Sequence, residues 1–131
     1  MSDAHYESLQ TVFAGHPEIR LVMLFGSAAA GTERPGSDID IAVQADRPLD
    51  TTTKMSLIAE LALTTGRAID LVDLNTVGAP SLAQIVRHGK RLIDSDAAYA
   101  RLITRHLIDE ADFLPYYRRI LVERRSAWIG R

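Results

Sequence analysis

The sequence predicts a small α/β or α+β domain with a helical C-terminal part, and two observations indicate this fold class. Apolar runs that end at glycine or turn residues alternate with segments whose apolar residues recur at helical spacing. From residue 96 onward the helical spacing dominates. The chain has 131 residues, 47% hydrophobic and 24% charged, which suits one soluble domain. We therefore expect a single domain with its core over about residues 1–95 and a helical segment over about residues 96–131.

The first part of the chain predicts one helix and then two strands. Residues 2–15 have a cap at Ser2 or Asp3 and apolar residues at helical spacing, namely Tyr6, Leu9, Val12 and Phe13. Residues 19–25, IRLVMLF, predict a buried strand that stops at a glycine. A second strand is expected over residues 37–45, SDIDIAVQA, because turn-rich segments flank it on both sides.

The second part continues the alternation. Residues 50–66 predict a connecting helix with a threonine or aspartate cap, a glycine stop and one apolar face formed by Met55, Ile58, Leu61 and Ala62. Residues 67–75, RAIDLVDLN, resemble the second strand. Residues 79–94 predict a short helix that ends near Gly89, followed by a brief extended piece. The last segment is helical by periodicity, with an interruption at Pro115.

Composition and charge exclude several classes of site and partner. The chain has no cysteine, so any metal must be held by oxygen or histidine ligands. Its apolar runs are much shorter than a membrane span and its first residues lack a secretory pattern, so we expect a cytoplasmic protein without a membrane partner. Residues 101–131 carry seven basic and four acidic side chains. This asymmetry is too mild for a nucleic-acid groove, and no direct nucleic-acid contact is expected.

Two aspartates in the second strand suggest a metal site. Residues two apart in a strand point to one face, so Asp38 and Asp40 lie side by side while Ile39 and Ile41 face the other way. Carboxylates roughly 6–7 Å apart on a half-buried surface repel each other and lose hydration. The arrangement becomes favourable when a divalent cation lies between them, and oxygen ligands favour Mg²⁺ or Mn²⁺. An isolated pair would be read as the polar face of an ordinary amphipathic strand.

The pair is not isolated, because a phosphate-binding segment precedes it. Ser27 lies eleven positions before Asp38, in FGS, where a strand ends in a glycine that lets backbone approach a ligand closely. The serine hydroxyl and the backbone N–H groups there are suited to phosphate. The sequence therefore predicts metal-binding carboxylates that face a phosphate cradle.

These residues resemble a known family. The spacing of Gly26-Ser27, ten intervening residues and Asp38-Ile39-Asp40 is similar to the signature of the nucleotidyltransferase superfamily related to DNA polymerase β. The stretch GSAAAGTERPGSDIDIAV resembles its minimal bacterial branch, the minimal nucleotidyltransferases or MNT proteins. The resemblance covers about residues 19–73, and residues 81–94 more loosely. It implies a small polymerase β-like fold, a mixed sheet flanked by helices, with C-terminal helices added.

The resemblance also implies a set of site residues. It assigns Gly26 and Ser27 to the triphosphate of ATP, Ser37 to further nucleotide contacts, and Asp38 and Asp40 to two Mg²⁺ ions. The implied reaction transfers a nucleoside monophosphate to a hydroxyl, and pyrophosphate leaves. One departure is that many members have arginine where this chain has Ala30, in GSAAAG. The lost cation puts the strength of nucleotide binding in doubt.

The family pattern implies a third catalytic carboxylate on a later strand, where two aspartates are available. Asp70 and Asp73 point to opposite faces of an alternating strand, so only one of them can join the site. We assign Asp70 as the third metal ligand because it sits among apolar neighbours in the family pattern. Asp73 is expected at the strand end or in a turn, with the reverse assignment as the alternative.

The resemblance implies an antitoxin that transfers AMP from ATP to a tyrosine of a cognate HEPN-domain ribonuclease toxin. The C-terminal segment is the expected docking element, since it contains residue types that are enriched at interfaces: Tyr116, Tyr117, Arg118, Arg119, Arg124, Arg125 and Trp128. Two alternatives stay open. One is a small-molecule enzyme like the aminoglycoside nucleotidyltransferases, and the other is an antitoxin that binds the toxin without catalysis.

Overall fold

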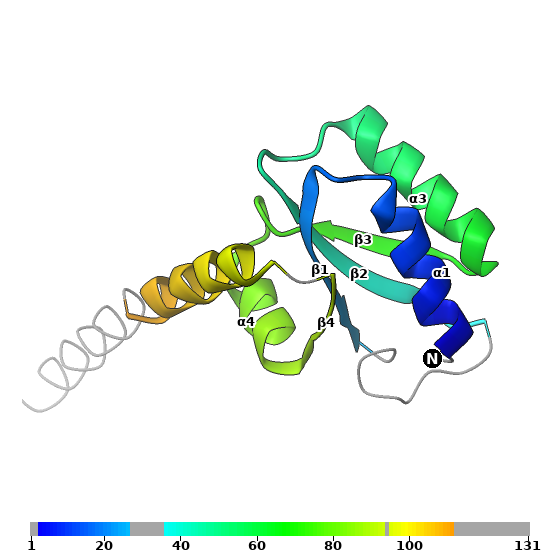
Figure 1. Ribbon diagram of the computed structural model, residues 1–131. Coiled ribbons are helices and arrows are strands. Elements are labelled where there is room, and N and C mark those ends of the chain that lie inside the picture. Colours follow the sequence, from blue (N-terminus) through cyan, green and yellow to red (C-terminus); the bar gives the residue numbers. More distant parts are fainter. Residues whose placement is uncertain (1–2, 27–35, 94, 112–131) are drawn as a thin grey trace, which may run out of the picture.

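A four-stranded sheet with helices against both faces forms the described structure (Figure 1). The computed structural model describes residues 3–26, 36–93 and 95–111. Its strands are β1 (Ile19–Phe25), β2 (Ile39–Ala45), β3 (Ile69–Asp73) and β4 (Lys90–Ile93). Its helices are α1 (Asp3–Ala14), α3 (Thr51–Thr65), α4 (Ala79–His88) and a further helix over residues 96–111.

The sheet is mixed, as the sequence predicts. The strand order is β3-β2-β1-β4, with β1 antiparallel to both β2 and β4, and with β2 parallel to β3. Parallel neighbours require a crossover connection, and α3 provides it between β2 and β3. Strands β1 and β2 are therefore central and are paired on both sides.

Helices α1 and α3 cover one face of the sheet and form a hydrophobic cluster with it (Figure 1). Alternate residues of the strands point to this face, among them Ile39 and Ile41 of β2 and Leu71 of β3. The two helices contribute buried apolar side chains, namely Leu9, Val12, Phe13, Leu57 and Leu61. Burying one such leucine side chain stabilises the fold by about 1.5–3 kcal/mol, so this layer fixes where both helices lie.

Helix α3 begins and ends as the sequence predicts. The Asp50 side chain caps the N-terminus by accepting a hydrogen bond from the Thr53 N–H at 2.7 Å, and this bond lowers the pKa of Asp50. Gly66 ends the helix with φ 68°, and its N–H donates to the Ala62 carbonyl. An aspartate cap and a left-handed glycine thus define the crossover.

The buried face of α3 differs from the predicted one at Met55. That side chain is 66% exposed, whereas Leu57 and Leu61 are fully buried. Successive helical residues are about 100° apart, so Met55 lies roughly 200° around the axis from Leu57. The prediction was wrong because α3 is apolar on more than one side, and contact with the sheet selects the stripe through Leu57.

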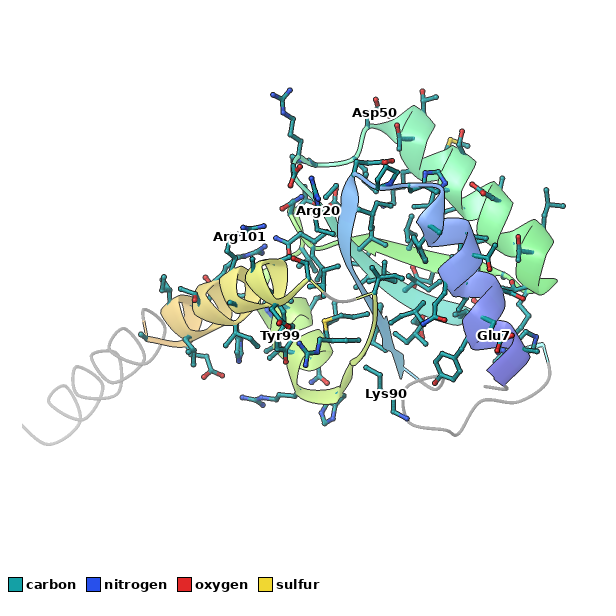
Figure 2. All side chains as sticks on the ribbon, in the orientation of Figure 1. Glu7, Arg20, Asp50, Lys90, Tyr99 and Arg101 are labelled. Carbon is teal, nitrogen blue, oxygen red and sulfur yellow. The ribbon has the colours of Figure 1, made fainter. Side chains whose placement is uncertain are left out.

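Helix α4 and helix 96–111 lie on the opposite face of the sheet (Figure 1). A second hydrophobic cluster joins them to the strands, and its buried members are Leu21, Met23, Ala42, Leu74, Leu82, Ile85, Ala98 and Leu102. Figure 2 shows Tyr99 and Arg101 on this side, away from Glu7 on α1. The Arg91 guanidinium lies 4.1 Å from the centroid of the Tyr99 ring, which adds a cation–π contact between β4 and helix 96–111.

Arg105 connects helix 96–111 to the turn that follows β3. Its guanidinium donates hydrogen bonds to the backbone carbonyls of Leu74 and Val77. A charged donor forms stronger hydrogen bonds than a neutral one, so this half-buried side chain holds the turn firmly. The C-terminal helix and the β3 turn are therefore one packed unit.

Asp73 stabilises the same turn from within. It is the last residue of β3 and is only 6% exposed. Its carboxylate accepts hydrogen bonds from the Leu49 N–H at 2.7 Å and from the Asn75 N–H at 2.9 Å. The predicted position of Asp73, at a strand end or turn, is confirmed.

His16 connects the turn between α1 and β1 to helix α3. Its Nε2 lies 2.8 Å from Glu60 Oε2, and its Nδ1 lies 3.4 Å from Glu18 Oε1. The hydrogen bond to Glu60 is the main cause of a raised pKa at His16, with Glu18 adding to it and partial burial opposing it. Protonation of the imidazole thus strengthens the contact between α1–β1 and α3.

Some predicted features lie outside the described residues. They are the cap at Ser2, the interruption at Pro115 and the aromatic, arginine-rich stretch that follows it. In residues 3–26, 36–93 and 95–111, no helix is long and apolar enough to cross a membrane.

Replacing Asp73 with alanine is expected to lower the free energy of unfolding by about 1–3 kcal/mol, because two backbone N–H groups lose their acceptor. Urea unfolding followed by circular dichroism measures the loss. Asp70→Ala is the matched control, since Asp70 is on the same strand but exposed. We expect it to leave the free energy of unfolding unchanged or higher, because it removes a carboxylate that repels Asp40. Equal losses in both variants would contradict the separate roles of the two aspartates.

The contribution of His16 to stability is expected to depend on pH. Because folding raises the pKa of His16 above its usual value of 6.5, the stabilisation is complete below that pH and is lost as the pH rises through the folded-state pKa. His16→Gln should therefore destabilise the protein more at acidic than at alkaline pH. The difference should be less than about 1 kcal/mol, because the His16–Glu60 pair is partly exposed. Thermal unfolding at two pH values tests this. Equal destabilisation by His16→Gln at both pH values would contradict a stabilising role of the charged imidazole.

Candidate nucleotide and metal site

The site is built around Gly26 and Asp40, where β1 ends and β2 begins. Phe25 and Asp40 are paired in the antiparallel register, so Gly26 follows directly beside the aspartate. Gly26 has φ 66°, and a Cβ atom added to it would lie 2.1 Å from Asp40 Oδ2. Only glycine adopts this backbone readily and leaves the carboxylate where it is. The glycine that was predicted to allow a close approach is thus in contact with one of the predicted metal ligands.

Asp40 and Asp70 are brought together by the parallel pairing of β2 and β3. They are direct partners in the register, and their side chains interact. The pKa of Asp40 is raised, chiefly because partial burial disfavours its charged form, then because of the charge of Asp70 and hydrogen bonding to it, and least because of Asp38. The carboxylates of Asp40 and Asp70 therefore lie side by side on neighbouring strands. Their repulsion contributes to the raised pKa of Asp40, the more buried of the two.

Both carboxylates project from the face of the sheet that carries α4. Their strand neighbours Ile39, Ile41 and Leu71 belong to the cluster on the α1 and α3 face, and strand residues alternate between faces. Phe25 is the register partner of Asp40, and Val72 lies two residues after Asp70, so both point to the same face as the aspartates. Both pack in the cluster on the α4 side of the sheet. The acidic pair thus lies on the same face of the sheet as the apolar cluster of α4 and helix 96–111.

Asp38 and Ser37 come just before β2 and not within it. Asp38 is exposed, in contrast to the half-buried Asp40. Ile39 donates its backbone N–H to the Ala68 carbonyl at 2.9 Å, and this bond starts the pairing with the β3 segment. The prediction that Asp38 lies in the strand was wrong by one residue, although Asp38 remains close enough to affect the pKa of Asp40.

Two predicted residues lie outside the described part of the chain, and one residue near the site was not predicted. Ser27 and Ala30 lie outside the described residues. Arg67 was not predicted, yet its Nε donates a hydrogen bond to the Ser37 carbonyl at 2.7 Å. No sequence pattern indicates this bond, because it joins positions thirty residues apart.

The chemistry of these side chains fits a hard divalent cation. All donors are carboxylate oxygens, and the partly desolvated Asp40 beside Asp70 is a pair whose repulsion a cation would relieve. Within the described ranges, no three acidic or histidine side chains are close enough to hold a metal as they stand. The structure thus brings two predicted ligands together, with exposed Asp38 next to them.

A hollow elsewhere on the protein does not include these carboxylates. It has a volume of about 610 Å³ and lies between α4 and helix 96–111, where its lining includes Ala83, Arg87 and His106. The Arg87 Nη2 and Glu110 Oε1 atoms are 3.0 Å apart across it. The groove is a separate feature from the acidic site.

The fold and the site define a class of protein. The family model for polymerase β nucleotidyltransferases matches residues 7–98, which include Gly26 and all three predicted carboxylates. The chain therefore belongs to the polymerase β nucleotidyltransferase family.

Its relatives include a protein adenylyltransferase, MntA of Shewanella oneidensis strain MR-1. The two sequences are 41% identical over 76 residues, which are 58% of this chain and 55% of that protein. The sequence match thus spans only about half of the relative.

Solved structures extend the likeness to most of the chain. A toxin–antitoxin crystal structure with AMP-PNP is similar with a TM-score of 0.76 and 28% identity, over 90% of this chain and 95% of that one. A complex of a tri-AMPylated Shewanella oneidensis HEPN toxin with an MNT antitoxin is similar with a TM-score of 0.72 and 26% identity, over 94% and 97% of the two chains. The predicted polymerase β-like fold is confirmed.

Gly26→Ala is expected to abolish nucleotidyl transfer, because the new methyl group would displace the Asp40 carboxylate. The left-handed backbone adds a stability cost of about 1–2 kcal/mol. Gly66→Ala is the matched control, since Gly66 has φ 68° and its added Cβ would contact nothing within 4 Å. It should lose comparable stability and keep its activity, as urea unfolding and a transfer assay would measure. Equal losses of activity would rule out a specific role for the contact between Gly26 and Asp40.

Proposed function

We propose that this protein is the nucleotidyltransferase antitoxin of a HEPN/MNT pair, which transfers AMP from ATP to a tyrosine hydroxyl of a cognate HEPN ribonuclease toxin. The observation that carries the proposal is the register pairing of Asp40 with Asp70 beside Gly26, in a chain of the nucleotidyltransferase family. The similarity to an adenylyltransferase and to MNT antitoxins in complex with toxin supports the acceptor and the partner. Modification of the tyrosine would neutralise the toxin.

In this proposal Asp38, Asp40 and Asp70 hold two Mg²⁺ ions. When bound, these ions would neutralise charge on the triphosphate and lower the pKa of the acceptor hydroxyl. Gly26 leaves room for the Asp40 carboxylate, and Ser27 and Ser37 would contact the nucleotide. Similarity to a structure with AMP-PNP supports ATP as the substrate.

The reaction is a displacement at the α-phosphorus of ATP. The tyrosine oxygen forms a new bond to that phosphorus, the bond to the bridging oxygen of the β-phosphate breaks, and pyrophosphate leaves. Asp70 accepts the tyrosine proton, because its exposed side chain can be reached by the acceptor hydroxyl, whereas Asp40 is half-buried. Positioning and charge stabilisation account for most of the catalysis in such transfers, so the chain needs few other catalytic side chains.

The proposed partner surface is the C-terminal part of the chain. In the described part of helix 96–111, Leu107 is 57% exposed and Ile108 is 55% exposed, although apolar side chains of the same helix are buried against the sheet. A toxin that covers these side chains would stabilise the complex. The packing of helix 96–111 against the sheet supports its being part of the same domain. We propose a single domain over residues 1–131 that acts in the cytoplasm.

Asp70→Asn is expected to reduce transfer at least about a hundredfold, because it removes a metal ligand and the proton acceptor together. Asp73→Asn should keep most of its activity at temperatures well below its unfolding transition, since Asp73 only stabilises a turn. The assay combines each variant with the proposed cognate HEPN toxin, ATP and Mg²⁺, and intact mass spectrometry counts the AMP groups. If Asp73→Asn were the inactive variant, the assignment of the third carboxylate would be reversed.

Removal of divalent metal is expected to weaken ATP binding strongly and to stop transfer. Calorimetric titration of ATP with Mg²⁺ and with a chelator measures the first effect. Equal affinities would contradict the proposed metal site. An unmodified toxin held in a stable complex, with Mg²⁺ and ATP present, would instead indicate an antitoxin that acts by binding alone.

A further inference from the structure

The backbone on both sides of Asp38 is held by specific restraints, although the Asp38 side chain is exposed. On one side, the Ser37 carbonyl accepts the hydrogen bond from Arg67 Nε at 2.7 Å. On the other side, the Ile39 N–H donates to the Ala68 carbonyl at 2.9 Å. Two consecutive residues, Arg67 and Ala68, therefore hold the two peptide units that flank Asp38.

Arg67 is the more decisive of these restraints because of where it acts. Gly36, with φ 82°, lies just before Ser37, so the chain turns there and not in the strand. The regular ladder of β2 and β3 begins only at Ile39 and Ile69. The direction in which Asp38 leaves the strand end is thus not set by the sheet. A charged N–H donor to the carbonyl directly before Asp38 supplies that direction, with a bond stronger than one between neutral groups.

Arg67 also ties together the two strands that carry the acidic pair. It lies three residues before Asp70, while the carbonyl it binds lies three residues before Asp40. Its half-buried side chain therefore spans from the β3 segment to the β2 segment at the end of the sheet where the carboxylates meet. Loss of this bond would remove one of the two restraints that flank Asp38 without removing the pairing of Asp40 with Asp70.

We propose that Arg67 is a positioning residue, which orients Asp38 as a metal ligand through its hydrogen bond to the Ser37 carbonyl. The proposal rests on the proposed function in that it takes Asp38 to be a ligand. Arg67 itself need not touch the nucleotide or the metal. Its action on the metal is expected to pass entirely through Asp38.

The test is Mn²⁺ binding to the full-length, nucleotide-free protein, measured by electron paramagnetic resonance of the free ion. Arg67→Met removes the donor and keeps an unbranched apolar stem, and it is expected to weaken Mn²⁺ binding about tenfold, as loss of a partner that orients a ligand does. Arg67→Lys keeps a charged donor and should recover most of the affinity. Arg20→Met is the matched control, because Arg20 pairs at 3.4 Å with the exposed Asp46 at the opposite end of β1 from Gly26.

A double-mutant cycle with Asp38→Asn separates positioning from a general structural effect. If Arg67 acts through Asp38, Arg67→Met should weaken Mn²⁺ binding no further in the Asp38→Asn background. Additive losses would overturn the proposal. So would an Arg67→Met protein that binds Mn²⁺ like the wild type and shows only a lower unfolding midpoint, since the bond would then stabilise the fold alone.

Transfer kinetics give a second readout that a structural role would not change. Below the unfolding transition, Arg67→Met should lower kcat and leave KM for the toxin unchanged, because helix 96–111 contacts the turn after β3 whereas Arg67 precedes that strand. If Arg67→Met does not fold, Arg67→Leu replaces it, since its side chain also carries no hydrogen-bond donor. An Asp38→Asn variant that binds Mn²⁺ normally would instead contradict the proposed metal site itself, so the two failures are distinguishable.

Discussion

Strand β2 is hydrogen-bonded to β1 on one side and to β3 on the other, and the register of these two ladders determines where the acidic residues lie. The antiparallel ladder sets Asp40 opposite Phe25 and thus beside Gly26, and the parallel ladder sets Asp40 opposite Asp70. A slip by one residue in either ladder would turn Asp40 to the other face of the sheet. The buried side chains of Ile39 and Ile41 prevent such a slip, because they would lose their place in the core under α1 and α3.

The position of Asp40 lowers the stability of the fold, and the apolar core offsets this cost. Asp40 is partly buried beside another carboxylate, and the rise in its pKa shows that the folded protein disfavours its charge. The fully buried leucines and isoleucines on both faces of the sheet offset this cost. The apolar scaffold can therefore hold two repelling carboxylates on neighbouring strands.

Polar contacts fix the segments that the sheet does not reach. Asp73 secures the turn after β3, Arg105 joins that turn to the C-terminal helix, and Arg67 holds the approach to β2. Each bond joins a side chain to a backbone group in a turn or just before a strand or helix. The carboxylates thus lie between ordered strands and loops that side chains hold in place.

The order of strands and helices, the capped crossover helix and the glycine before the acidic pair were determined by the sequence itself, because local propensities and the spacing of apolar residues act over short stretches of chain. The family pattern, which matched Asp70, left Asp73 for a strand end or turn, and Asp73 is the last residue of β3. Only the tertiary structure decided that Leu57, and not Met55, is buried in α3, since two faces of that helix are apolar and contact with the sheet selects one. It also decided that Asp38 lies just outside β2, that Asp70 pairs with Asp40, and that Arg67 binds the Ser37 carbonyl. These relations join residues far apart in the chain, and the energies that select them arise only when the strands are packed together.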